Sequence, residues 1–299
     1  MTRWLITGAN GMLGTDLVAL LTAAGEPVIS LGRDGLDITD GTAAKEAMAM
    51  ARADVVVNCA AWTAVDDAEA HEDEALAVNG HAVATLATAC AAVGAALVHV
   101  STDYVFDGTA TSPYQEDAVP APRTVYGRTK LAGERAALAT LPDAAYIVRT
   151  AWLYGAHGPN FVRTMLGLAH AGISPTVVDD QHGQPTWSLD VARQIHSLIR
   201  VGAPAGIYHA TSSGETTWYG LAGEVFKLFA AAQVAPDSGG QPSPAPTTSA
   251  ACQRPAPRPA YSVLGHGAWT ATGIPPIPDW RGSLHRAFPA LLARSRPTV

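Results

Sequence analysis

The stretch Thr7-Gly8-Ala9-Asn10-Gly11-Met12-Leu13-Gly14 decides the fold of this chain. It follows the apolar run Trp4-Leu5-Ile6 and precedes a helical pattern, so it predicts a strand, a glycine turn and a helix. Glycines permit a tight turn, and the N-terminus of the helix presents N–H groups that bind a dinucleotide pyrophosphate. The spacing is G-x-x-G-x-x-G, so a plain glycine turn is the alternative. The residues expected at the pyrophosphate are Gly8, Asn10, Gly11, Met12, Leu13 and Gly14.

Short apolar runs alternate with longer helical patterns through the first half of the chain. This alternation is typical of repeated βαβ units and of a parallel sheet. The expected strands lie near 3–7, 27–31, 54–58, 95–100 and 144–149, and the expected helices near 12–24, 41–51, 72–93 and 125–140. Strands such as Asp54-Val55-Val56-Val57-Asn58 are nearly all apolar, as in a sheet covered on both faces. The predicted fold class is α/β, with a doubly wound, Rossmann-like parallel sheet.

Beyond about residue 155 the pattern loosens into shorter elements rich in Gly, Pro, Trp and His. We predict a dinucleotide-binding domain over 1–155 and a smaller substrate lobe over 156–299, with some segments of the lobe returning to the main sheet. The stretch from Pro236 to Pro259 is dense in Pro, Ser, Thr and Ala, a composition that predicts a flexible linker. Two further tryptophans follow this stretch, so a loop that crosses a cleft is the alternative.

The composition is that of an ordinary globular protein, with 299 residues, 48% hydrophobic and 15% charged. A net charge of -7 without a basic block argues against nucleic-acid and membrane partners and favours small-molecule chemistry. The three cysteines suit neither a zinc site nor a disulfide framework, and we expect no metal. The N-terminus leaves no room for a signal peptide, and no apolar run approaches the length of a membrane span. These features predict a cytoplasmic protein.

The expected second strand ends in Ser30-Leu31-Gly32-Arg33, where an NAD-specific protein usually has an acidic residue. An arginine at this place binds a 2′-phosphate through its forked guanidinium, so Arg33 predicts NADPH. Asp34 is adjacent, which leaves NADH as the alternative cofactor. Asp37 and Ile38 are expected to border the adenine, and Cys59, Ala60 and Ala61 to line the path of the cofactor. Ordinary turn and packing roles are the alternative for these residues.

Tyr126-Gly127-Arg128-Thr129-Lys130 places a phenol and an ammonium one turn apart on a helix. A nearby cation favours the phenolate and makes the phenol a better proton donor near neutral pH. Thr102 follows a strand at the edge where ligands of such sheets bind, and its hydroxyl is expected to join Tyr126 as a donor to a substrate carbonyl. Lys130 is also expected to hold the nicotinamide ribose. The predicted catalytic set is therefore Thr102, Tyr126 and Lys130.

At these residues the chain resembles an extended short-chain dehydrogenase/reductase and, more narrowly, the dTDP-4-dehydrorhamnose reductase family. The resemblance covers nearly the whole length. The segments that carry it are Thr7–Gly14, Leu36–Asp40, Ala60–Asp66, Ser101–Gly108, Tyr126–Glu134, Arg149–Gly155 and Asp180–Thr186. It implies an NAD(P)H-dependent reduction of the C4 ketone of a dTDP-linked 4-keto-6-deoxyhexose, with Thr102, Tyr126 and Lys130 as the catalytic residues.

The resemblance also implies a substrate site. The residues that it places around the sugar are Val65, Asp66, Asp103, Tyr104 and Trp152, and those near the nucleotide are Asn160, Gln181 and Trp218, with Arg258 on the diphosphate. A guanidinium fork matches the charge of a diphosphate. Core packing is the alternative for the tryptophans. Trp62 replaces a common histidine, and Ala256–Pro259 keeps one arginine where the family often has two. We therefore expect an altered sugar pocket, suited to a deoxysugar of a specialised metabolite.

Two other functions stay open at the level of sequence. A regulatory relative of this family keeps the nucleotide fold but acts by binding a partner, and such a protein can retain the catalytic residues. An epimerase or dehydratase of the same superfamily recycles tightly held NAD. Asp103 next to Thr102 is typical of dehydratases, whereas Tyr104 stands where they carry a glutamate. The hexose, the stereochemistry at C4 and the choice between monomer and homodimer are also left open.

Overall fold

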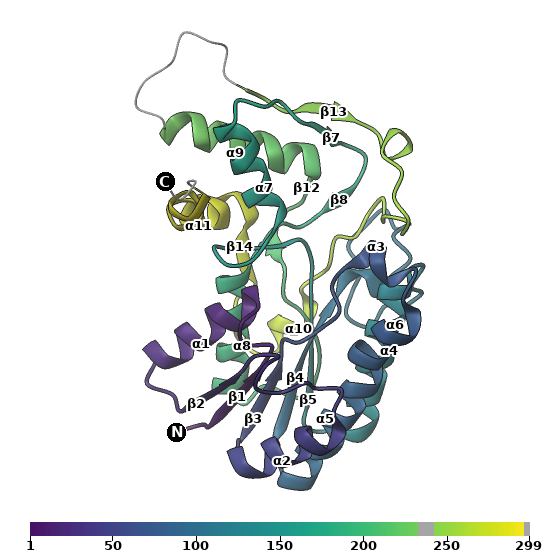
Figure 1. Ribbon diagram of the computed structural model, residues 1–299, viewed down its shortest axis with the longest axis vertical. Helices are drawn as coiled ribbons and strands as arrows, with labels where there is room; N and C mark the ends of the chain where they lie inside the picture. The colour runs from purple at the N-terminus through teal and green to yellow at the C-terminus, as the bar shows by residue number, and fades with distance from the viewer. Residues whose placement is uncertain (233–241, 296–299) are drawn as a thin grey trace.

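The computed structural model describes residues 1–232 and 242–295, and a parallel sheet lies at its centre (Figure 1). Six strands of the described chain form this sheet in the order β10-β5-β4-β3-β1-β2, all paired in parallel. Their bounds are β1 Trp4–Thr7, β2 Val28–Leu31, β3 Val55–Asn58, β4 Ala96–Thr102, β5 Ala145–Thr150 and β10 Gly206–His209. The strand order changes direction between β1 and β3, which is where ligands bind in such sheets. All five predicted strands are confirmed.

Helices cover both faces of the sheet (Figure 1). On one face α1 and α8 pack over a core that includes Ile6 and Val57, and on the other α2, α5 and α6 pack over Leu5 and Val56. The bounds of these helices are α1 Met12–Ala23, α2 Gly41–Ala51, α5 Ala82–Val93, α6 Val125–Thr140 and α8 Ser188–Arg200. Cover on both faces explains why the strands are nearly all apolar and confirms the doubly wound α/β fold.

The expected helix over 72–93 consists of α4 (Glu72–Leu76), a π-helical turn η1 (Ala77–His81) and α5. Glu72–Val93 is long and apolar enough to cross a membrane by length and composition, so the prediction that no apolar run approaches that length is wrong. Its most apolar window is 44% buried, and the helix packs against α2 and α6, as core helices of globular proteins do.

The second half of the chain builds a smaller lobe beyond the carboxyl ends of the strands (Figure 1). Its core joins α7, α9 and α11 through side chains such as Leu166, Phe226 and Trp280. The helices of this half are α7 Phe161–His170, α9 Trp218–Ala232, α10 Gly267–Thr270 and α11 Trp280–Ser295. Its short strands are β6 Leu153–Tyr154, β7 Thr176–Val178, β8 His182–Gly183, β9 Thr186–Trp187, β11 Ser212–Ser213, β12 Thr216–Thr217, β13 Ala245–Thr247 and β14 Ile277–Asp279. The segments that return to the main sheet are α8, β10 and α10.

The segment 242–259 connects the lobe to the main sheet. β13 pairs with β7 in the lobe, whereas Arg258 forms an ion pair with Asp66 and Pro259 packs against Gly108. The described part of the predicted linker is therefore a loop that crosses between the two halves, and residues 236–241 of that prediction lie outside the described residues.

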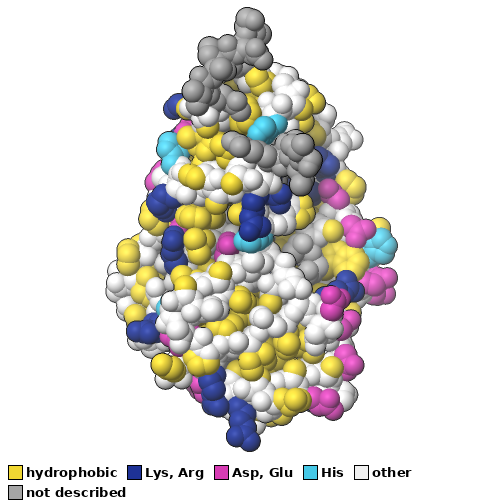
Figure 2. Space-filling view, turned by 60° about the vertical axis from the view of Figure 1, so that its left-hand side comes forward, with side chains coloured by type: hydrophobic (Ala, Val, Ile, Leu, Met, Phe, Trp, Pro, Cys, Tyr) yellow, Lys and Arg dark blue, Asp and Glu magenta, His cyan; other side chains and the backbone are white. Residues whose placement is uncertain are grey.

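On the face shown in Figure 2, Lys and Arg side chains are scattered among neutral and hydrophobic ones.

Candidate active site

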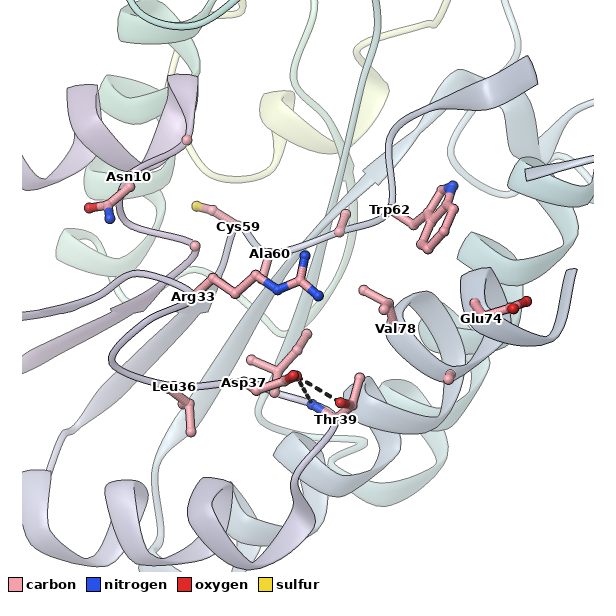
Figure 3. Close-up of a pocket in the computed structure, with 15 residues that line it drawn as sticks. Asn10, Arg33, Leu36, Asp37, Thr39, Cys59, Ala60, Trp62, Glu74 and Val78 are labelled. Carbon is pink, nitrogen blue, oxygen red and sulfur yellow. Dashed lines mark hydrogen bonds between the residues drawn. The ribbon is translucent and has the colours of Figure 1, made fainter. Parts of the chain in front are cut away.

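A cavity of about 550 Å³ opens where the strand order changes direction, between β1 and β3 (Figure 3). Its walls come from the glycine turn, the end of β2, the turn after β3 and the helix over 72–93. The residues that line it are Gly8, Asn10, Gly11, Arg33, Leu36, Asp37, Ile38, Thr39, Cys59, Ala60, Ala61, Trp62, Glu74, Ala77 and Val78. The predicted cofactor residues that do not line it are Met12, Leu13, Gly14, Tyr126 and Lys130.

The glycine turn is packed so closely that two of its positions exclude any side chain. Gly8 has a φ of +63°, and a Cβ there would lie 2.5 Å from the backbone nitrogen of Ala60. At Gly14 a Cβ would lie 2.4 Å from the carbonyl oxygen of Gly8. Gly11 caps α1 without a side-chain hydrogen bond, so the first-turn N–H groups, starting at Met12, are open to an anion. Together these features fit a dinucleotide pyrophosphate.

Met12 and Leu13 therefore serve this site through their backbone. The Leu13 side chain is buried in the core between α1 and the sheet, and that of Met12 lies against Gly155. At the other end of the cavity, Arg33 is exposed and projects its guanidinium into the space between Asn10 and Trp62 (Figure 3).

Asp37 lies beneath Arg33 in the same cavity (Figure 3). Its Oδ1 accepts hydrogen bonds from the backbone nitrogen and the hydroxyl of Thr39, at 2.9 and 2.7 Å. These bonds lower the pKa of Asp37, and the charge of Arg33 adds a smaller effect in the same direction. The carboxylate is thus anchored to its own turn, and the guanidinium extends away from it over the cavity.

Thr102 and Tyr126 meet where β4 ends and α6 begins. Thr124 caps α6 by accepting a hydrogen bond from the backbone nitrogen of Gly127 at 3.0 Å. A Cβ on Gly127 would lie 2.1 Å from the carbonyl oxygen of Tyr104, so α6 starts directly on the turn η2 (Asp103–Val105). This packing holds the rings of Tyr104 and Tyr126 edge to face, with centroids 5.6 Å apart.

The phenol of Tyr126 is neutral at physiological pH. Burial raises its pKa to about 12, and a hydrogen bond with Thr102 offsets part of that rise. The expected lowering of this pKa by Lys130 is wrong for this structure, because the lysine turns toward the sheet. Its Nζ donates to the carbonyl oxygen of Val100 at 2.6 Å and lies 3.3 Å from Nε2 of His99.

Lys130 is almost completely buried, with 2% of its surface exposed. Burial lowers its pKa from 10.5 to about 8, and Glu134 and Cys59 oppose this effect. The Glu134 carboxylate is itself held by Arg149, at 2.7 Å, in a buried ion pair. A lysine that titrates near neutrality is well suited to proton transfer.

Two residues of this neighbourhood, Asn58 and His99, are absent from the sequence-based prediction. Each is fully buried on a strand, Asn58 at the end of β3 and His99 in the middle of β4, on the face that packs against α5 and α6. The signal available in the sequence was a single polar residue within an apolar strand.

The predicted sugar residues lie around the turn η2. Asp103 is 3% exposed, burial raises its pKa to about 6, and its Oδ1 accepts a hydrogen bond from Thr102 at 3.0 Å. Asp66 follows Val65 at the start of α3 (Val65–Ala68), and its Oδ2 accepts from Arg258 at 2.8 Å. Arg258 also lines a second cavity of about 300 Å³ together with Tyr104. A diphosphate at Arg258 would therefore compete with Asp66 for the guanidinium.

The residues predicted at the nucleotide are in the lobe. The rings of Trp152 and Trp218 stack at 3.6 Å, and Trp152 has a φ of +46°. A Cβ on Gly183 would lie 2.4 Å from the Trp152 ring, so only glycine leaves room for it. Asn160 caps α7 by accepting from Arg163, and Gln181 donates to Ser249 at 2.8 Å. The two amides thus already serve the fold, and their contact with a nucleotide stays a prediction.

The described residues, 1–232 and 242–295, contain no group of three or more His, Cys, Asp or Glu side chains that could hold a metal ion.

A family model described as the RmlD substrate binding domain matches residues 2–292. The chain belongs to this family. A dTDP-4-dehydrorhamnose reductase of Streptomyces griseus is 54% identical and aligns with 98% of this chain and 95% of the relative. A dTDP-4-keto-6-deoxy-D-glucose reductase of Streptomyces niveus is 50% identical, over 97% and 98% of the two chains. The predicted family resemblance is thereby confirmed.

Solved structures of RmlD-type proteins share the fold. The crystal structure of a dTDP-4-dehydrorhamnose reductase from Bacillus anthracis, in complex with NADP, superposes with a TM-score of 0.90 at 34% identity. The match covers 96% of this chain and 98% of that one.

Proposed function

We propose that this protein catalyses the NADPH-dependent reduction of the C4 ketone of a dTDP-linked 4-keto-6-deoxyhexose. The observation that carries the proposal is the convergence of a buried Thr102 and a neutral, partly buried Tyr126 at the edge of the sheet where the dinucleotide pocket opens. Relatives that are 54% and 50% identical are named for reductions of this kind, and a structural neighbour was solved with NADP.

The residues that would hold the cofactor belong to the pocket at the start of α1. The glycine turn and the first-turn N–H groups suit the pyrophosphate, and Arg33 suits the 2′-phosphate that distinguishes NADPH from NADH. Asp37 and Ile38 would border the adenine, and Lys130 the nicotinamide ribose. When bound, NADPH supplies the hydride that adds to C4 of the sugar.

The chain itself supplies the proton. As the carbonyl oxygen gains negative charge, Thr102 would turn its hydroxyl from Asp103 to donate a hydrogen bond to it, and Tyr126 would transfer its phenolic proton to it. The O–H bond of Tyr126 breaks, its electron pair stays on the phenolate oxygen, and a new O–H bond forms on the sugar. General acid catalysis of this kind contributes roughly 10²- to 10⁴-fold. Lys130, which titrates near the working pH, would return the proton to Tyr126 after each turnover.

The substrate would lie between the two halves of the molecule. Asp103, Tyr104 and Val65 would contact the sugar, and Arg258 would exchange its bond to Asp66 for the diphosphate. The stacked pair Trp152 and Trp218 would border the nucleotide, near Asn160 and Gln181. A cytoplasmic location and the division into a cofactor domain over 1–155 and a substrate lobe over 156–299 belong to the same proposal.

The test is to incubate the protein with NADPH and dTDP-4-keto-6-deoxyglucose, with and without a 3,5-epimerase, and to follow the loss of NADPH absorbance. Consumption that requires the epimerase identifies 4-dehydrorhamnose as the substrate, whereas consumption without it identifies a direct reduction of the 6-deoxyglucose compound. No consumption in either mixture contradicts the proposed substrates.

A further inference from the structure

A row of buried polar side chains crosses three strands of the main sheet and ends at Lys130. Thr7, Asn58 and His99 are paired neighbours on β1, β3 and β4, and each is at most 1% exposed. Their side chains point to the face that packs against α5 and α6. A Cβ on Gly133 of α6 would lie 3.3 Å from Nε2 of His99, so this glycine keeps the space beside the imidazole free.

The direction of each hydrogen bond in this row follows from its first members. The backbone N–H of Ala60 can only donate, and it lies 3.2 Å from Oδ1 of Asn58. The hydroxyl of Thr7 donates to the same oxygen at 2.7 Å. The other end of the Asn58 amide is therefore NH₂, a donor, and it lies 3.2 Å from Nδ1 of His99.

His99 must then accept at Nδ1 and carry its proton on Nε2. Burial and the nearby charge of Lys130 lower the pKa of His99 well below its ordinary value, so the imidazole stays neutral and does not take a second proton. Its Nε2–H faces Nζ of Lys130 at 3.3 Å. An ammonium group has no lone pair to accept this hydrogen bond, whereas a neutral amine does.

We propose that His99 is a positioning residue for Lys130: its Nε2–H donates a hydrogen bond to the lysine nitrogen and stabilises the neutral amine. The amine still donates a hydrogen bond to the carbonyl oxygen of Val100 at 2.6 Å. The lysine nitrogen is thus oriented by one hydrogen bond that it accepts and one that it donates. Asn58 acts one step earlier, because its amide selects the tautomer of His99.

The other groups around Lys130 do not supply this effect. Glu134, one turn further along α6, favours the ammonium, but its carboxylate is already bound by Arg149 and Ser101. The thiol of Cys59 is neutral, because burial raises its pKa to about 12. His99 is thus the group within hydrogen-bond distance that favours the neutral amine over the ammonium.

The inference rests on the proposed function for its consequence in catalysis. After each turnover Tyr126 must regain a proton, and a lysine that gains and loses its proton near the working pH passes one on at the least cost. Burial brings Lys130 close to that range, and His99 lowers its pKa further by stabilising the amine. Without His99 the ammonium would hold its proton more tightly.

The tautomer of His99 is measured first, on the full-length protein labelled with ¹⁵N-histidine. Two-bond ¹H–¹⁵N spectra distinguish the two neutral tautomers and the imidazolium, and the His99 signal is the one lost in His99→Leu. The expected result is the Nε2–H tautomer at every pH at which the protein is folded. An Nδ1–H tautomer or an imidazolium at neutral pH would overturn the inference.

The titration of Lys130 is measured next, by NMR of protein labelled in its lysine side chains. The chain has three lysines, Lys45, Lys130 and Lys227, so the signals are readily assigned by substitution. In His99→Leu the pKa of Lys130 is expected to rise by about one pH unit, the size of one lost hydrogen bond to the amine. A fall would mean that an ammonium donates to His99, and no change would mean that the imidazole serves only packing; both contradict the inference.

His209→Leu is the matched control. His209 is also a buried imidazole on this sheet, but it contacts Arg149 and the carbonyl oxygen of Gly265 rather than Lys130. Its substitution is expected to leave the pKa of Lys130 unchanged. In the enzyme assay, the alkaline limb of the pH profile of kcat should move to higher pH in His99→Leu, together with the pKa of Lys130. In His209→Leu it should remain at the same pH. The NMR results do not depend on substrate, so an inactive protein with the expected tautomer would refute the proposed function and not this inference.

Discussion

Substitution of Tyr126 by phenylalanine isolates the proton donor from the rest of the site. The change removes one oxygen from a partly buried ring whose shape and packing against Tyr104 are retained. Thr102 lies beside this hydroxyl and opposes part of the rise in its pKa. Thr102 keeps its bond to Asp103 at 3.0 Å, so its hydroxyl stays partnered in the variant. The fold and the dinucleotide pocket should therefore change little.

The expected loss lies in the chemical step. General acid catalysis contributes roughly 10² to 10⁴ in rate, which corresponds to about 3 to 5 kcal/mol of barrier height. The assay is a single turnover with enzyme in excess over dTDP-4-keto-6-deoxyhexose, followed by NADPH absorbance after the dissociation constant of NADPH has been measured. Tyr126→Phe should bind NADPH within about fivefold of the unchanged protein, since loss of one neutral hydrogen bond costs on the order of 1 kcal/mol.

Tyr104→Phe is the matched control, because it removes the same atom from the neighbouring ring. It should lower the single-turnover rate by less than about tenfold, the size of one lost neutral hydrogen bond to the substrate. If Tyr126→Phe transfers hydride at the normal rate, or if both variants lose the same large factor, Tyr126 is not the acid.

The remaining predictions concern the cofactor pocket and the buried lysine. Arg33→Ala should weaken NADPH by roughly 10-fold or more and NADH by much less, since a charge-assisted bond to phosphate is worth about 1.5 to 3 kcal/mol; equal losses in binding titrations would place Arg33 away from the 2′-phosphate. Gly8→Ala should destabilise the fold by about 2 to 4 kcal/mol through strain and overpacking, whereas Gly25→Ala, at a similar φ of +73° with open space around it, should cost only about 1 to 2 kcal/mol in denaturant unfolding. Lys130→Met should be more stable than the unchanged protein at pH 7, because the folded pKa of the lysine, about 8, lies below its unfolded value. Between these two pKa values the unfolded state binds more protons than the folded state, so the stability of the unchanged protein rises with pH over that range. The stability difference should therefore shrink between about pH 8 and pH 10, and a constant difference would contradict the buried position of Lys130.

The main sheet could be predicted because its information is local. Each of the five predicted strands is a short apolar run, the first four are followed by a turn and a helical pattern, and the glycine turn after β1 marks the first of them. β10 was missed because Gly206–His209 has only two apolar residues, Ile207 and Tyr208, and becomes a strand by pairing with β5. That pairing joins residues about sixty positions apart and leaves no mark in the segment itself.

The candidate site likewise has features that follow from local sequence and features that depend on contacts between distant segments. The spacing from Tyr126 to Lys130 on one helix is readable in the sequence, and so is the position of Thr102 at a strand end. The direction in which the Lys130 side chain points cannot be read from the sequence. It depends on His99, which lies on β4, and on Gly133, which has no side chain. Likewise, Arg258 and Asp66 are separated by 192 residues, so their ion pair emerges only from the folded chain.

The central claim is that a hydride reaches C4 of the sugar at the site that Thr102 and Tyr126 form. The most direct measurement is a turnover with NADPH carrying deuterium on the transferred position, followed by NMR of the sugar nucleotide produced. The account predicts deuterium on C4 of the product from the unchanged protein and far less product from Tyr126→Phe in the same time. Deuterium that stays on the cofactor, or that appears at a carbon other than C4, would contradict it.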